Sequence, residues 1–102
     1  MSQASISELS PGLITLAGVL DYSSAPALRE QGARLIKGAS AATCVIDCTG
    51  VVKSSSVGVS LLLAFMRDAA AAGKAFSIKG LPNDMREIAN VCGLLEILPQ
   101  QA

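Results

Sequence analysis

Short β-type runs alternate with longer helical patterns along most of the chain. The β-type runs are rich in Ile, Val, Leu and Thr, whereas the helical patterns repeat apolar residues at helical spacings. Strands that alternate with helices predict a mainly parallel or mixed sheet with helices packed against it. We therefore expect one α/β domain over residues 1–102, with four to five strands and three to four helices. The β-type runs lie at residues 6–8, 13–17, 43–47 and 75–78, and the helical patterns at 26–36, 57–72 and 85–92.

Glycines and turn residues predict where these elements end. The second strand should stop at Gly18, and Asp47–Gly50 should close the third strand in a turn. The third strand carries apolar residues on both faces, which predicts that it is covered on both sides. Leu94–Leu98 is expected to add a short edge strand or a final turn. Helices should end at Gly38, Gly73 and Gly93.

Hydrophobic residues make up 51% of the chain and aromatic residues only 3%, so the core must be built from Leu, Ile, Val and Ala. Cys44 and Cys48 would lie about 13 Å apart along a strand, too far for a disulfide. Cys92 falls on the apolar stripe of the third helical pattern with Met85 and Ala89. We expect all three cysteines to be buried, reduced thiols in a cytoplasmic protein.

Charge and hydropathy exclude several classes of partner. Eight basic residues balance eight acidic ones, so there is no basic surplus for nucleic acid. Residues 1–4 lack the charge of a signal peptide and precede no apolar run. The longest apolar run, Val57–Met66, is too short to span a bilayer. The expectation is a soluble cytoplasmic protein that does not insert into a membrane itself.

Few residues offer catalytic chemistry. The chain has no histidine, which removes the usual general base and the commonest metal ligand. Neither a dinucleotide fingerprint nor a phosphate loop occurs, and the aspartates are scattered. Lys53 beside Ser54 is the one formal base–nucleophile pair. We expect no catalytic residue, no cofactor and no metal.

Three serines, Ser54, Ser55 and Ser56, stand immediately before the second helical pattern. One interpretation is capping, in which a hydroxyl satisfies one of the unpaired amides at the helix start. The other is that a helix start displaying hydroxyls accepts or mimics a phosphate. Spacing alone leaves both open.

The helix after these serines has an apolar arc of about 200°, at about 100° per residue, centred near Leu62. One edge of this arc suits a partner-binding surface, because it mixes hydroxyls, an aliphatic side chain and a cation. The alternative is an ordinary core boundary. The arc comprises Val59, Leu61, Leu62, Leu63, Phe65 and Met66, and the edge comprises Ser56, Ser60, Leu63 and Arg67.

The stretch Asp47–Val51, followed by Ser55–Gly58 and a Leu-rich helix ending in Gly73, resembles the STAS domain family. The resemblance covers residues 9–98 and implies a single STAS-like α/β domain. In this family an Asp-[Ser/Thr]-x-Gly turn opens the second helix, and its hydroxyl residue is phosphorylated or critical for partner binding. The resemblance places that residue at Ser56 and the glycine at Gly58. Ser55 stands where the family has aspartate.

The tail from Gly80–Asp84 to Pro99 is more similar to the MlaB branch of the family. That resemblance implies a non-catalytic subunit that docks on the ATPase of an ABC transporter, peripheral to the inner membrane. The transporter moves phospholipids between the inner and outer membranes of Gram-negative bacteria and maintains outer-membrane lipid asymmetry. The alternative is an anti-sigma-factor antagonist switched by phosphorylation of Ser56, and a small-ligand sensor is a third hypothesis.

Overall fold

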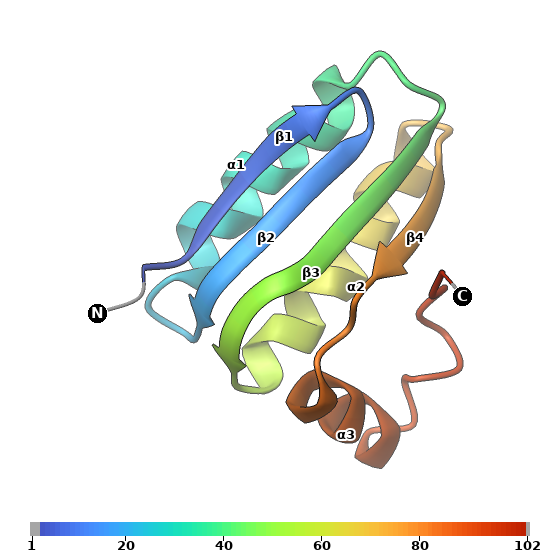
Figure 1. The fold of residues 1–102 in the computed structure, drawn as a ribbon. Helices are drawn as coiled ribbons and strands as arrows, with labels where there is room; N and C mark the ends of the chain where they lie inside the picture. The colour runs from blue at the N-terminus through green and yellow to red at the C-terminus, as the bar shows by residue number, and fades with distance from the viewer. Residues whose placement is uncertain (1–2, 102) are drawn as a thin grey trace.

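A β-hairpin opens the fold, and two strand–helix–strand units extend it into a mixed sheet (Figure 1). The structure, a computed structural model, describes residues 3–101. The strand order is β1-β2-β3-β4, with β1 antiparallel to β2 and the other pairs parallel. The predicted single α/β domain is confirmed, with four strands and three helices in the described residues. The elements are β1 Ser5–Ser10, β2 Leu13–Leu20, α1 Ala25–Gly38, β3 Thr43–Ser54, α2 Ser56–Ala71, β4 Ala75–Lys79 and α3 Asn83–Val91.

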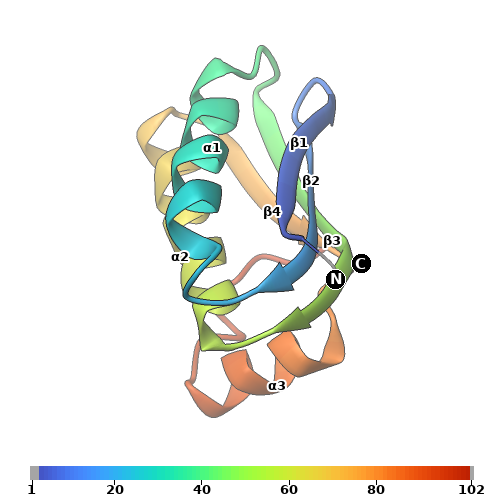
Figure 2. The ribbon, with the colours of Figure 1, turned by 90° about the vertical axis from the view of Figure 1, so that its left-hand side faces the viewer.

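Helices α1 and α2 cover one face of the sheet, and α3 lies beyond the end of β3 (Figures 1 and 2). The prediction that the third strand is covered on both sides was wrong. Cys44 and Ile46 face the helices and are fully buried, whereas Val45 points to the opposite face and is only partly buried. Both crossovers advance across the sheet in the same direction, so right-handed connections place α1 and α2 on one face.

The second strand passes through Gly18 instead of stopping there. It runs to Leu20, and Gly18 adopts a φ of +92° that side chains disfavour. A Cβ at this position would also collide with the backbone of Gln3 and Ala4. Glycine therefore lets β2 continue while the segment that leads into β1 lies close beside it.

The third strand likewise continues beyond Asp47–Gly50, where a turn was predicted. The backbone N–H and the hydroxyl of Thr49 both donate to Asp47 Oδ1, at 2.9 and 2.7 Å, and the pairing with β2 shifts register between Asp47 and Gly50. The N–H bond, with the hydroxyl adding to it, lowers the pKa of Asp47. The motif is a local irregularity rather than an end, because β2 remains alongside and pairs Leu20 with Ser54.

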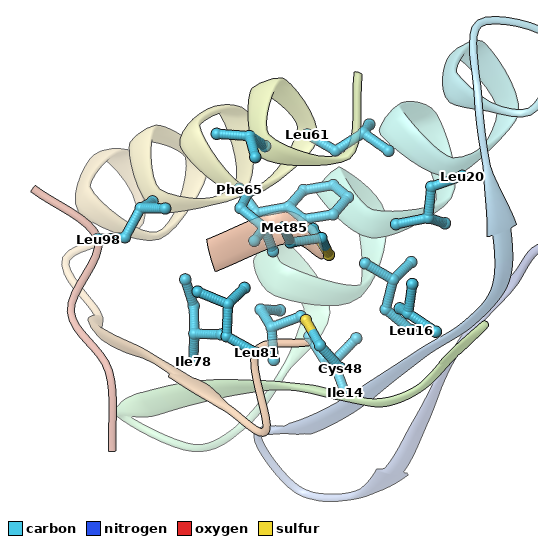
Figure 3. Packing of buried hydrophobic residues seen from close by; sticks show 14 of the residues in the cluster. Ile14, Leu16, Leu20, Cys48, Leu61, Phe65, Ile78, Leu81, Met85 and Leu98 are labelled. Carbon is cyan, nitrogen blue, oxygen red and sulfur yellow. The ribbon is translucent and has the colours of Figure 1, made fainter. Parts of the chain in front are cut away.

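The core lies between the sheet and the two helices and is built from aliphatic side chains around one aromatic ring (Figure 3). Phe65 from α2 is fully buried. A Cβ at Gly32 of α1 would collide with its ring, so this glycine lets the two helices approach closely. The predicted centre of the apolar arc is confirmed, because Leu62 is also fully buried.

The three free cysteines have different surroundings. Cys44 and Cys48 are buried, as predicted, and burial raises the pKa of Cys44 and raises the pKa of Cys48 to about 12. Cys92 is exposed, so the prediction for it was wrong. Helix α3 ends at Val91, and Cys92 is the C-cap next to the turn at Gly93, so its side chain does not join the buried stripe of Met85 and Ala89.

The C-terminal segment forms turns and returns to the sheet. Leu98 is buried, and Gln100 makes a single parallel bridge to Ile78 of β4. Of the two predicted outcomes for Leu94–Leu98, the turn is the one observed. No helix within residues 3–101 is both long enough and apolar enough to cross a bilayer.

Candidate partner-binding site

The three serines at the β3–α2 turn have three different surroundings. Ser54 is buried, and its hydroxyl donates to the carbonyl of Ser55 at 2.8 Å. Ser55 is the N-cap, because its hydroxyl accepts from Val57 N–H at 3.2 Å. Ser56 is the first helical residue, is exposed, and shows no side-chain hydrogen bond to any other described residue. Capping therefore belongs to Ser55, and the hydroxyl of Ser56 is left free at the helix start.

Gly58 lets the first turn of α2 sit directly on the layer below. A Cβ at this position would collide with Ser54 Oγ and would lie 3.1 Å from Met85 Cε and 3.2 Å from Leu20 Cδ1. These three neighbours come from β3, α3 and β2 respectively. The glycine of the predicted motif thus sets how closely the helix start approaches the sheet, and it is buried rather than available to a partner.

A carboxylate from α3 fastens the same turn. Asp84 Oδ2 accepts the backbone N–H of Ser54 at 3.0 Å, and Asp84 Oδ1 accepts its neighbour Met85 N–H at 2.8 Å. No sequence pattern predicts this contact, because Ser54 and Asp84 are 30 positions apart and the aspartates are scattered along the chain. An acidic group therefore reaches the turn from α3, although Ser55 holds the position where the family has aspartate.

Four predicted site residues form an outward row on α2, here called the α2 ridge: Ser56, Ser60, Leu63 and Arg67. Ser56, Ser60 and Arg67 are exposed and Leu63 is partly buried. Ser56 and Phe65 are nine residues apart, about half a turn out of phase at about 100° per residue, so the ridge faces away from the sheet. The prediction had placed this row at an edge of the apolar arc. The arc is narrower than predicted, because Leu63 and Met66 are only partly buried.

Beside the ridge lies a hollow of about 290 Å³ between the starts of α1 and α2. Sequence reasoning missed it, because it depends on how two helices distant in sequence pack together. Tyr22, in the β2–α1 connection, is 83% exposed and was also missed. Its connection adjoins the serine turn, since Ser55 N–H donates to the carbonyl of Leu20 at 3.0 Å. The hollow is lined by Ala25, Pro26, Arg29, Val57, Ser60, Leu61 and Ala64.

Asp21, just after β2 and beside the serine turn, is engaged in hydrogen bonds within its own turn. Asp21 accepts from the hydroxyl of Ser23 at 2.6 Å and from the backbone N–H of Ser24 at 3.1 Å, and these bonds lower its pKa. Ser54 Oγ donates to a carbonyl rather than to Lys53. Among residues 3–101, no group of three or more Cys, Asp or Glu side chains could hold a metal ion. The site presents hydroxyls and an aliphatic side chain, which suit contact with another protein.

A family model described as "Mlab, STAS domain" matches residues 7–99. The chain belongs to the STAS domain family. This confirms the family to which the Ser55–Gly58 turn and the Leu-rich helix pointed. No curated protein sequence matches the chain.

Solved structures of other STAS proteins share the fold. An anti-sigma-factor antagonist from Mycobacterium paratuberculosis superposes with a TM-score of 0.77 at 22% identity, covering 98% of this chain and 85% of that one. The antagonist SpoIIAA in its unphosphorylated form gives 0.73 at 17% identity, covering 98% and 89%. Bacillus SpoIIAA in its phosphorylated form superposes with a TM-score of 0.67 at 18% identity, covering 98% of this chain and 92% of that one. At these identities the likeness establishes the fold alone, and the roles of Ser56 and the α2 ridge stay predictions.

Proposed function

We propose that this STAS domain is a non-catalytic accessory subunit that docks on the ATPase subunit of an ABC transporter. The transporter would traffic phospholipids between the inner and outer membranes of a Gram-negative cell and so maintain outer-membrane lipid asymmetry. The observation that carries the proposal is the match of residues 7–99 to the family model that bears the Mlab description. The domain would then lie at the cytoplasmic side of the inner membrane, held there through the ATPase.

The geometry of the β3–α2 turn supports docking through the α2 ridge. Ser54 and Gly58 are buried and fix the helix start, while Ser55 caps it. A fixed turn presents Ser56 in one orientation, and pre-organised surfaces lose less entropy on binding. The ridge then continues along the helix as Ser60, Leu63 and Arg67, a mixture of polar rim and apolar centre that partner interfaces use.

A second candidate function is an anti-sigma-factor antagonist switched by phosphorylation of Ser56. The observation in its favour is that Ser56 is exposed at the first position of α2, with its hydroxyl free. A phosphate there would be stabilised by the positive end of the helix dipole. The Bacillus protein SpoIIAA, which shares the fold, has a phosphorylated form. The absence of an acidic residue at Ser55 favours the transporter.

Binding assays with two purified partners from the same organism separate these functions. We expect the purified domain to bind the transporter ATPase by isothermal titration calorimetry, and not the kinase that partners a sigma factor. Leu63→Asp on the ridge should weaken binding to the ATPase. Its control is Leu35→Asp, which places the same charge on a leucine of α1 that is also partly buried but lies off the ridge. Binding to the kinase with phosphate transfer to Ser56, and none to the ATPase, would contradict the proposal.

A further inference from the structure

The hollow beside the α2 ridge exists because small side chains face each other across the helix pair. Ala25 and Pro26 of α1 and Val57, Leu61 and Ala64 of α2 are among the residues that line it. Small residues at these positions cannot fill the space between two helices that Phe65 and Gly32 hold in contact farther along. The result is a mainly apolar depression of about 290 Å³ at the surface.

An ion pair closes one end of this hollow. Arg29 Nη1 and Nη2 donate to the two oxygens of Asp68 at 2.5 and 3.2 Å, bridging α1 and α2. On the other side of the bridge lies a second hollow, lined by Ala33, Lys37, Ala71 and Ala72 as well as the pair itself. The seam between the helices is therefore divided into two compartments, of which only the first adjoins the serine turn.

We propose that the first hollow accepts one large apolar side chain, aromatic or branched aliphatic, from the protein that docks on the α2 ridge. The inference rests on the proposed function and names the chemistry of the contact. The hollow, of about 290 Å³, is mainly apolar and has room for a side chain of this kind. Anchors of this sort dominate the binding energy of many interfaces.

Continuity with the ridge connects the hollow to the same partner. Ser60 belongs to both, because it lies on the exposed row and also lines the hollow. Its hydroxyl donates a hydrogen bond to the carbonyl of Ser56 at 3.4 Å. Ser60 therefore stands at the boundary between the ridge and the hollow. Tyr22, 83% exposed on the adjoining connection, adds an aromatic side chain of the type enriched in interfaces.

The charges around the hollow indicate what flanks the anchor. Asp68 is neutralised by Arg29, and Asp21 is bonded within its own turn. Arg67 on the ridge makes no ion pair with any residue the structure describes. Arg67 therefore has no acidic partner among the described residues, and we expect the partner segment to carry a carboxylate that pairs with it, next to the apolar anchor.

Filling each hollow in turn tests the proposal. Ala64→Phe places a ring in the first hollow, and Ala71→Phe places the same ring in the second, as the matched control. Ala25→Leu fills the first hollow from the opposite wall, should Ala64→Phe fail to fold. Affinity for the purified ATPase subunit is measured by isothermal titration calorimetry, and folding by circular dichroism.

We expect Ala64→Phe and Ala25→Leu to weaken binding at least about tenfold, with Ala71→Phe within about twofold of the parent. Arg67→Glu should weaken binding through the flanking carboxylate. Equal binding by the parent and by both first-hollow variants overturns the anchor proposal alone. No binding by the folded parent overturns the proposed function, and the anchor proposal with it.

Discussion

The inward and outward faces of α2 differ in burial and in side-chain chemistry. The inward face carries Leu62 and Phe65, both fully buried against the sheet and α1. The outward face carries the α2 ridge, in which only Leu63 is partly buried. One helix thus separates the residues that hold the fold together from those that we propose contact a partner. Substitutions on the two faces should therefore affect different measurements.

The largest effect is expected from Leu62→Asp. A carboxylate without a partner would be buried in the core, which costs more than about 4 kcal/mol and leaves the domain largely unfolded. Thermal melting followed by circular dichroism measures this loss. If the variant melts at the temperature of the parent, Leu62 does not belong to the face that holds the fold.

Gly58→Ala should be the next most damaging change. Its Cβ would collide with Ser54 Oγ, and we expect a loss of about 2 kcal/mol in the free energy of unfolding. The matched control is Gly38→Ala at the end of α1, where a Cβ meets no atom within 4 Å. Chemical denaturation of both variants checks this, and an equal effect of the two changes would contradict it.

Leu63→Asp tests the outward face. Because Leu63 is only partly buried, we expect the free energy of unfolding to fall by only about 1 kcal/mol. Affinity for the ATPase subunit should fall at least about tenfold, or about 1.4 kcal/mol. Leu35→Asp should lose similar stability and keep its affinity. Normal binding by Leu63→Asp would mean that the ridge does not contact the partner.

The cysteines sharpen the comparison, because Cys48 lies in the core that α2 covers. Cys48→Ala should lower the free energy of unfolding by about 1 kcal/mol, whereas Cys92→Ala should change it by less than about 0.5 kcal/mol. A thiol reagent should modify Cys92 rapidly in the folded protein and Cys44 and Cys48 only on unfolding. Rapid modification of all three would show that the core opens readily.

The same thiol predicts a loss of stability in alkali. Burial raises the pKa of Cys48 from 9.0 to about 12, so the folded state favours the protonated thiol. That contribution is fully present below pH 9.0 and is lost as pH rises towards 12. Cys48→Ala should show a shallower fall in melting temperature over this range than the parent. Identical slopes would exclude Cys48 as the cause.

The smallest effect is expected from Ser56→Ala. Ser55 supplies the cap, so removing the Ser56 hydroxyl should change stability by less than about 0.5 kcal/mol, whereas Ser55→Ala should cost about 1 kcal/mol. Ser56→Asp should fold normally, because the helix dipole tolerates a negative charge, but should bind the ATPase more weakly. Reversed costs for the two alanine variants would reassign the cap.

Local patterns predicted the elements well because short-range spacing determines them. The apolar periodicity around Leu62 predicted the buried face of α2, and of the two interpretations of the serines capping is observed at Ser55. Gly18 and Asp47–Gly50 were misread as strand ends, since only a neighbouring strand shows that pairing continues past them. The bond from Ser54 N–H to Asp84 and the hollow between α1 and α2 arise from tertiary packing, for which single-sequence spacing gives no signal.

The Asp84 contact also has a consequence for the order of events during synthesis. A ribosome releases the β3–α2 turn well before α3, because Ser54 precedes Asp84 by 30 positions. A nascent chain that has exposed only the turn therefore lacks the carboxylate that fastens Ser54. The β3–α2 turn reaches its final form only after the C-terminal third has emerged and α3 has packed against β3. If a partner docks through this turn, assembly would thus follow the completion of the chain.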